Sequence, residues 1–240
     1  MNSPYGFQSV ESCIDCKELG SGGCFCDLPP EALKAFEAIK QPGTYLKGAL
    51  LFIEGQTPRG IYILCQGRVK LSICSTEGKM LILRIAEAGE LLGLSATVSN
   101  LPYEMTAETI EPCQATFIKR GDFLRFLREH GAASFRVAQH LSQNYHQAYV
   151  QIRSLGLAQS AGEKLAKLLL DWCLASGQET EQGIRLKLSL THEEVARMIG
   201  TSRETVSRHI SEFRGKEIIN LKGSNLLVRN KAALEAMVSS

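Results

Sequence analysis

Four cysteines lie close together near the beginning of the sequence. They are Cys13, Cys16, Cys24 and Cys26, within the fourteen-residue segment CIDCKELGSGGCFC. The Cys-x-x-Cys spacing lets two thiolates meet one metal ion or cluster, and the glycine-rich stretch between is pliable enough to bring in further thiolates. Thiolates select zinc, copper(I) or iron–sulfur clusters. The segment is therefore a candidate metal or redox site.

The other four cysteines are scattered in mostly apolar surroundings, where a thiol usually behaves as a small buried hydrophobe. They are Cys65, Cys74, Cys113 and Cys173. The first residues, MNSPYGFQSVES, lack the basic start and apolar stretch of a secretory signal. We therefore expect a cytoplasmic protein, in which a disulfide framework is not expected.

A second group of residues has the chemistry to read DNA bases. Arg203, Glu204, Ser207 and Arg208 lie within six positions. Arginine can make a paired contact to guanine O6 and N7, and glutamate can accept a hydrogen bond from cytosine N4. Lysine and arginine alone would mostly hold phosphates. The set predicts sequence-specific contact with double-stranded DNA.

Two short helices are predicted to position this group. Thr191 and Glu194 form a capping-box pattern that opens the first helix, EEVARMI, which ends at Gly200. Ser202 then caps the second helix, SRETVSRHISEFRGKEII. Two helices joined by so short a turn predict a helix-turn-helix, whose second helix enters the major groove. The candidate DNA-binding residues are Thr191, Thr201, Ser202, Arg203, Glu204, Ser207 and Arg208. Ala196 and Val206 have the small and branched side chains needed where the two helices cross.

Composition sets the class of protein. The chain has 240 residues, of which 44% are hydrophobic and 22% charged, which is typical of a folded, soluble protein. No apolar run approaches the roughly 20 residues that cross a bilayer, so a membrane protein is not expected. The net charge of +2 neither indicates nor excludes nucleic acid as a partner.

Upstream of the helix-turn-helix, the sequence predicts a β-domain followed by a long helix. Between residues 46 and 118, glycines separate short runs of strand-like residues, and Thr76-Glu77-Gly78-Lys79 has hairpin-turn chemistry. This pattern, with no helical period, favours an antiparallel barrel or jelly roll. A helix capped by Asp122 follows, with a 3.5-residue repeat typical of a coiled-coil seam. The repeat favours self-association over packing on the chain's own barrel. Its members include Ala138, Leu141, Tyr145, Ala148, Ile152 and Leu155.

A third region begins near Gln159. AGEKLAKLLLDWCLASG predicts an amphipathic helix ended by Gly177 in the left-handed conformation. We therefore expect an α+β fold with four parts: a cysteine-rich segment at 1–27, a β-barrel at 28–121, a dimerisation helix at 122–157, and a winged helix-turn-helix at 158–240.

The pattern TxxEVAxxIGTSRETVSRHI resembles the DNA-reading segment of the CRP/FNR family of bacterial transcription regulators. The resemblance extends to Gly48-Ala49-Leu50-Leu51-Phe52-Ile53-Glu54-Gly55, to Ile61–Leu71 and to Gly89-Glu90-Leu91-Leu92-Gly93, and covers roughly residues 28 to 240. It implies a homodimer on a pseudo-palindromic operator, with RNA polymerase as a further partner. By matching positions, it implies a TGA-like half-site with Arg208 on the guanine. Ser207 beside Arg208 resembles the oxygen-sensing, FNR-like branch.

The resemblance also bears on what the chain senses. Family barrels often bind a cyclic nucleotide through a glutamate and an Arg-Ser pair, but here Leu94 and Tyr103-Glu104 stand at those positions. A phosphate pocket that gains a carboxylate in place of its cation is electrostatically wrong, so cyclic nucleotide sensing is not expected.

In the oxygen-sensing branch, three N-terminal cysteines and one barrel cysteine hold an iron–sulfur cluster. Cys13, Cys16 and Cys26 resemble the first three. The expected fourth position falls at Ala115, and Cys113 shares its strand face, displaced by roughly 7 Å. Cys24 is an alternative fourth ligand. Structural zinc, a thiol switch and a regulator without any sensor remain the alternatives.

An enzyme is not expected. Thioredoxin-like chemistry needs the Cys-x-x-Cys after a strand and at a helix N-terminus, which this segment does not offer. The histidines lie in predicted helices without metal or nucleophile spacing; they are His130, His140, His146, His192 and His209.

Overall fold

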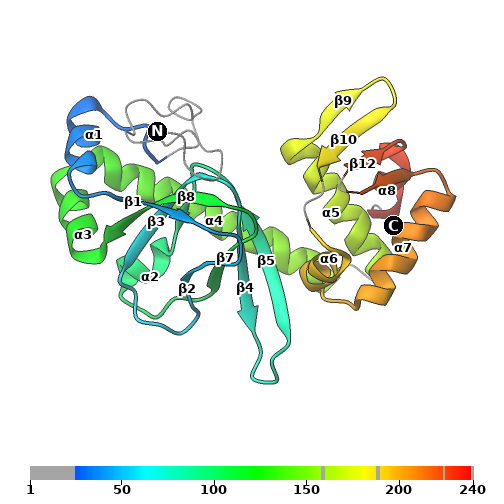
Figure 1. The fold of residues 1–240 in the computed structure, drawn as a ribbon, viewed down its shortest axis with the longest axis horizontal. Helices are drawn as coiled ribbons and strands as arrows, with labels where there is room; N and C mark the ends of the chain where they lie inside the picture. Colours follow the sequence, from blue (N-terminus) through cyan, green and yellow to red (C-terminus); the bar gives the residue numbers. More distant parts are fainter. Residues whose placement is uncertain (1–24, 158–159, 188–189, 224, 239–240) are drawn as a thin grey trace. The chain divides into compact units, whose positions relative to one another are not determined.

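The computed structural model describes residues 25–157, 160–187, 190–223 and 225–238. The chain divides into two compact units, Met1–Gln147 and Ala148–Ser240 (Figure 1). Each unit has its own hydrophobic core. In the described ranges, no helix is both long and apolar enough to span a bilayer.

The first unit contains two antiparallel sheets of four strands each. Their strand orders are β1-β8-β3-β6 and β2-β7-β4-β5. Apolar side chains from both sheets, such as Phe52, Leu64, Leu71 and Ala115, form one buried cluster between them. The predicted antiparallel jelly roll is confirmed. The strands are β1 (Gln41–Tyr45), β2 (Leu50–Phe52), β3 (Gly60–Gln66), β4 (Val69–Cys74), β5 (Met80–Ala86), β6 (Leu91–Leu92), β7 (Thr106–Thr109) and β8 (Cys113–Lys119).

The predicted hairpin turn is present between β4 and β5. The backbone N–H of Ser75 donates to the Lys79 carbonyl at 2.9 Å, and Gly78 adopts φ +78°. A positive φ favours glycine, which explains the turn signal in the sequence.

Helices pack on the outside of this jelly roll. A second buried cluster joins Phe36 of α1 (Pro30–Glu37), Phe123 and Phe126 of α3 (Arg120–Glu129) and Val137 of α4 (Gly131–Leu157). The sequence did not predict α2 (Leu94–Ser99) within the strand region. A helix of six residues is shorter than two turns and therefore leaves little periodicity to detect.

The helical segment after the barrel is interrupted, whereas the sequence predicted one helix from Asp122. The first helix, α3, begins two residues earlier at Arg120. The backbone then becomes extended at His130 (φ −125°, ψ 91°) before α4 begins. The break lets Phe126 before it and Val137 after it face the same core cluster.

The second unit is a winged helix-turn-helix, as predicted. Its helices and its sheet, of order β11-β12-β10-β9, enclose one core that includes Leu165, Val206, Phe213 and Leu226. The elements are α5 (Ala161–Ser176), β9 (Gln178–Thr180), β10 (Gly183–Lys187), α6 (His192–Ile199), α7 (Arg203–Gly215), β11 (Ile219–Lys222), β12 (Asn225–Val228) and α8 (Lys231–Val238).

Gly177 ends α5 for a different reason from the one predicted. Its φ is −70°, so it is not left-handed. A Cβ at this position would lie 2.3 Å from the Cys173 carbonyl oxygen and 2.6 Å from a methyl group of Ile184. Glycine is needed here for a close approach of α5 to β10.

Candidate nucleic-acid interface

The turn between α6 and α7 is built by side-chain caps. Thr191 Oγ1 accepts from the Glu194 N–H while the Glu194 carboxylate accepts from the Thr191 N–H at 2.8 Å, which confirms the predicted capping box. Gly200 ends α6 with φ +67°, in the left-handed conformation. Ser202 Oγ then accepts from the Thr205 N–H at 3.2 Å and starts α7. Thr191 and Ser202 therefore fix the motif itself, in addition to any contact with DNA.

The packing of the two helices determines which face of α7 remains available. Ala196 and Val206, predicted at the crossing, are 1% and 0% exposed. Ile210 and Phe213 of α7 are buried in the same core. Because one face of α7 is held by these contacts, the opposite face is turned to the surface.

The outward face of α7 carries the predicted base-reading residues. Arg203, Glu204 and Arg208 are exposed, and Thr201 is half-buried. A hydrogen bond from its own backbone, and a second with Ser202, lower the pKa of Glu204 below its usual value. Its carboxylate is therefore ionised at neutral pH, as an acceptor from cytosine N4 must be.

Ser207 differs from its neighbours because it is half-buried and bonded to the other helix. His192 Nδ1 of α6 lies 2.9 Å from Ser207 Oγ. The contact limits the orientations open to this hydroxyl. The sequence predicted only that His192 is a surface or interface residue, since nothing in the spacing indicated this pair.

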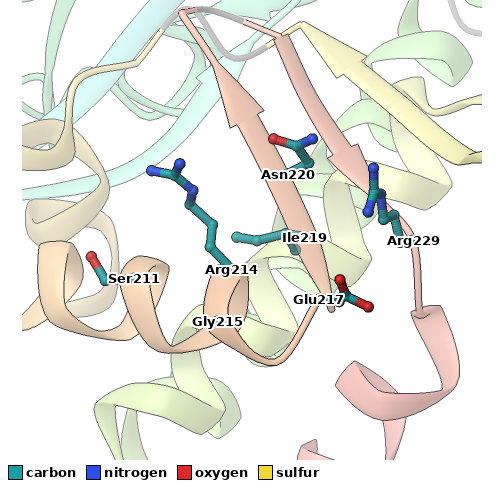
Figure 2. Close-up of a pocket in the computed structure, with 7 residues that line it drawn as sticks. All are labelled: Ser211, Arg214, Gly215, Glu217, Ile219, Asn220 and Arg229. Atoms are coloured by element: carbon teal, nitrogen blue, oxygen red, sulfur yellow. The ribbon is translucent and has the colours of Figure 1, made fainter.

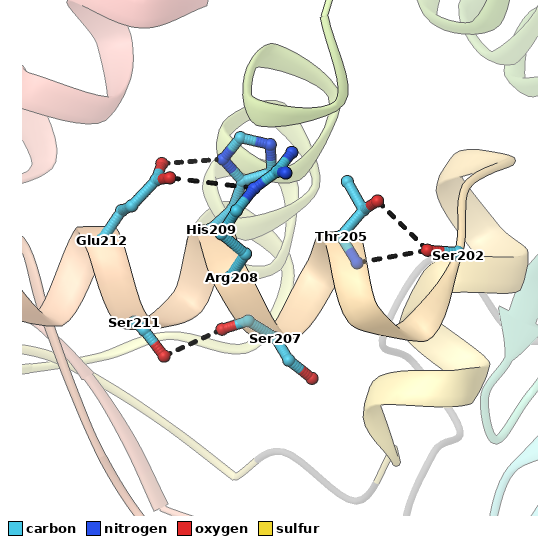
Figure 3. A network of polar contacts seen from close by, with 7 residues as sticks. All are labelled: Ser202, Thr205, Ser207, Arg208, His209, Ser211 and Glu212. Carbon is cyan, nitrogen blue, oxygen red and sulfur yellow. Dashed lines mark hydrogen bonds and ion pairs between the residues drawn. The ribbon is translucent and has the colours of Figure 1, made fainter.

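A polar network orients Arg208 (Figure 3). One carboxylate oxygen of Glu212 lies 3.9 Å from Arg208 Nε, and the other lies 3.0 Å from His209 Nδ1. The His209 ring lies close to Gly162 of α5, since a Cβ added at that glycine would be 3.4 Å from the ring. Glu212 thus connects this half-buried histidine to the exposed arginine. The i, i+4 spacing of Arg208 and Glu212 could have suggested this pair from the sequence.

We expect Glu212→Gln to lower the ratio of operator affinity to unrelated-DNA affinity. The change frees Arg208 and removes a carboxylate that repels phosphates near the reading face. The loss should be about 0.2–1 kcal/mol, the usual strength of an exposed ion pair. Titrations at one salt concentration measure it. The control is Glu235→Gln on α8, which removes a comparable i, i+4 pair with Lys231. A lower melting temperature with an unchanged ratio would show that Glu212 is only structural.

The candidate dimer residues fall on two sides of α4. Ala138, Tyr145, Ala148 and Ile152 are exposed, whereas Leu141 packs partly buried against the core of the first unit. The side chain of Leu155 lies outside the described residues. Exposed side chains on α4 still recur at alternating spacings of three and four residues. This exposed row has Ser142 and Tyr149 in place of the predicted Leu141 and Ala148. This row consists of Phe135, Ala138, Ser142, Tyr145, Tyr149 and Ile152.

The structure describes two of the five candidate metal ligands. Cys13, Cys16 and Cys24 lie outside the described residues. Cys26 is buried at the start of the described chain, and Cys113 is buried in the separate cluster between the sheets. Among the residues that the structure describes, no three His, Cys, Asp or Glu side chains gather closely enough to hold a metal ion.

The barrel positions expected to hold a cyclic nucleotide have other roles. Leu94 is buried in the cluster that also contains residues of α1 and α3. Tyr103 is buried between the sheets, where its ring stacks on Phe52 at 4.2 Å and its hydroxyl donates to the Gly60 carbonyl at 2.6 Å. Glu104 is exposed. Neither Leu94 nor Tyr103 supplies a charge to a ribose or a phosphate.

Comparison with known proteins agrees with this architecture. Residues 163–237 match the family model of the Crp-like helix-turn-helix domain, and residues 42–130 match that of the cyclic nucleotide-binding domain. The two matched regions together cover more than half of the chain.

Curated relatives match along most of their length. The CRP-like cAMP-activated global transcriptional regulator of Mycobacterium tuberculosis is 25% identical over 216 residues, covering 90% of this chain and 96% of the relative. The Anaerobic regulatory protein of Bacillus subtilis is 25% identical over 205 residues, covering 85% and 86%.

Solved structures show the same fold. FixK2 from Bradyrhizobium japonicum aligns with a TM-score of 0.74 at 19% identity, covering 84% of this chain and 98% of that one. A mutant of CooA from Carboxydothermus hydrogenoformans aligns with a TM-score of 0.73 at 24% identity, covering 84% and 88%. With the matched domains and their order along the chain, these similarities lead to one conclusion: the chain belongs to the CRP/FNR family of DNA-binding transcription regulators.

Proposed function

We propose that this regulator binds a pseudo-palindromic operator as a homodimer and responds to oxygen or redox state through an iron–sulfur cluster at its N-terminal cysteines. The observation that carries the DNA-reading part is that Arg203, Glu204 and Arg208 are all exposed on α7. A paired arginine contact and a glutamate acceptor can discriminate bases in the major groove. The proposed half-site has a TGA-like core, with Arg208 on its guanine.

The dimer proposal rests on the exposed row of α4. Phe135, Tyr145 and Ile152 are 65%, 66% and 67% exposed, and Tyr149 is 52% exposed. Large apolar and aromatic side chains repeated at 3.5-residue spacing are buried when a second helix packs alongside. A second copy of α4 has the complementary row, because a two-fold interface uses the same surface on both subunits.

The sensor proposal is supported by how the end of the cysteine-rich segment meets α4. Phe25 is fully buried, with its ring centroid 6.4 Å from that of His140, and Asp27 pairs with Arg136. Both partners lie on α4. A change at Cys24 or Cys26 is therefore next to a residue that contacts the proposed dimer helix.

Burial makes Cys113 a poor ligand. Its thiol donates to the carbonyls of Arg68 and Glu111 at 3.3 and 3.2 Å, and burial raises its pKa to about 11. Cys113 also lies in the buried cluster between the sheets, whereas Cys26 belongs to the separate buried cluster that includes α1, α3 and α4. The proposed ligands are therefore Cys13, Cys16, Cys24 and Cys26, all within one segment. A bound iron–sulfur cluster would supply the redox chemistry.

We expect Cys24→Ser to lose metal and Cys113→Ser to retain it. After anaerobic purification, the wild type and Cys113→Ser should show the same visible spectrum and the same iron and sulfide content. Cys24→Ser should lose most of both, because three thiolates leave one cluster position open. The reverse pattern would contradict the proposed ligand set. A wild-type protein that is colourless and metal-free, and binds DNA equally in air, would contradict the cluster itself.

A regulator without a cluster is the second candidate. The same four thiols suit structural zinc or a thiol switch, and zinc in place of iron in that metal analysis would favour it. RNA polymerase is the further proposed partner, by family resemblance, and the cytoplasm the proposed location.

A further inference from the structure

An open groove of about 400 Å³ lies where α7 ends and β11 begins (Figure 2). Figure 2 shows Arg214 on the α7 side and Arg229 on the other side, with Ile219 and Asn220 of β11 between them. Ser211 and Glu217 complete its polar lining. The groove therefore offers two guanidinium groups, two neutral polar side chains and one carboxylate.

Both arginines of the groove are available to an anion. Arg214 and Arg229 are exposed. The ion pairs of the second unit, as far as the structure describes it, involve other cations: Arg197, Arg208, His209 and Lys231. A guanidinium presents several N–H donors in a planar fork that matches phosphate oxygens. The charge of the groove favours a phosphate-bearing partner.

The carboxylate of the groove stands on an unusual backbone. The N–H of Glu217 donates to the Arg214 carbonyl at 3.0 Å, and the N–H of Ile218 donates to the Phe213 carbonyl at 2.9 Å. These two bonds end α7 in a Schellman motif, whose left-handed position is usually glycine. Here Glu217 occupies it with φ +56°. A side chain kept in this conformation beside two arginines points to a role for its charge.

The groove lies on the side of α7 that carries Arg203 and Ser207, two of the predicted base-reading residues. Arg214 lies eleven residues after Arg203 and seven after Ser207, so the three side chains share one side of the helix. Arg214 lies ten residues after Glu204, which corresponds to about 15 Å along the helix axis at 1.5 Å per residue. The major groove is only about 12 Å wide. When the start of α7 meets the bases, its end reaches the bordering sugar–phosphate backbone.

We infer that this groove binds the DNA backbone at the border of the half-site, with Arg214 and Arg229 each contacting a phosphate. Glu217 weakens the attraction, so that only a backbone placed correctly by base contacts is held firmly. The inference rests on the proposed insertion of α7 into the major groove. It adds a second contact surface that reads backbone position and not base identity.

The test replaces operator phosphates one at a time with neutral methylphosphonates and measures the affinity of the full chain. For the wild type, replacing any one of two or more phosphates that border each half-site should lower the affinity. For the double variant Arg214→Ala/Arg229→Ala, the same replacements should leave the affinity unchanged, whereas replacements at other phosphates should have the same effect as in the wild type. Its slope of log affinity against log salt should fall by about 1.8 per DNA-bound subunit, or about 0.9 for each lost phosphate contact. Its preference for operator over unrelated DNA should persist.

Two further variants make the result specific. Lys231→Ala, which removes a cation of α8 outside the groove, should keep the whole wild-type methylphosphonate pattern. Glu217→Gln should tighten binding to every duplex. A double variant that keeps the full wild-type pattern would overturn the proposal and leave the groove to an acidic protein partner. A wild type that selects no operator would instead overturn the placement of α7, and the groove proposal with it.

Discussion

Arg208→Ala should lose much of its preference for the operator over unrelated DNA. The ratio of the two affinities should fall by about 5- to 150-fold. The reason is the loss of one paired contact to guanine, which costs about 1–3 kcal/mol of discrimination. Arg208 is exposed on α7, where its guanidinium can reach a base, and Glu212 lies 3.9 Å from its Nε. The measurement is a pair of titrations at the same salt concentration, since affinity for DNA depends steeply on salt.

The matched control is Arg197→Ala. Arg197 also lies in the helix-turn-helix, but on α6, where its Nε is 3.1 Å from Glu193. Its removal should weaken binding to both DNAs similarly, or not at all. Arg208→Lys should fail to restore the preference, because an ammonium group cannot make the planar paired contact. An unchanged preference in Arg208→Ala would contradict base reading by this residue.

Tyr145→Glu should convert the dimer into monomers and lower operator affinity by about 10²- to 10⁴-fold. Tyr145 is 66% exposed at the centre of the apolar row on α4. On a two-fold axis, two carboxylates would face each other in an apolar interface, which is strongly unfavourable. A monomer reads one half-site and loses the effective concentration of its partner. Sedimentation gives the oligomeric state, and titration with one or two half-sites gives the affinities.

Two control variants distinguish an effect on the dimer interface from an effect on folding stability. Leu174 is 77% exposed on α5 outside this row, so Leu174→Glu should remain dimeric. Leu141→Ala should lower the melting temperature, because Leu141 packs against the core of the first unit. A dimeric Tyr145→Glu would contradict the proposed interface.

The parts that could be predicted were those determined by local chemistry. The capping box at Thr191 and Glu194, the helix end at Gly200 and the turn at Gly78 each depend on neighbours a few residues away. The same holds for the alternation that indicates strands. These features and the family resemblance were sufficient for the fold and for the face of α7.

The parts that were missed depend on contacts between distant segments. Which positions of α4 form the exposed row could not be derived from the sequence. Leu141 is partly buried because it packs against the core of the first unit. Cys113 shares the strand face of Ala115, but only the structure shows that its thiol donates to two carbonyls. The pairing of His192 with Ser207 and the groove formed by Arg214 and Arg229 join residues separated by fifteen positions in each case. No local pattern marks such pairs.

The central claim is that two copies of α7 read an inverted repeat under control of the N-terminal cysteines. It is tested most directly by selecting bound DNA from a random pool, with protein kept free of oxygen and with protein exposed to air. The predicted result is two inverted TGA-like half-sites about one DNA turn, or roughly 34 Å, apart. Their enrichment should differ between the two conditions. Enrichment of no sequence would contradict the reading role of α7, and equal enrichment in both conditions would contradict oxygen control.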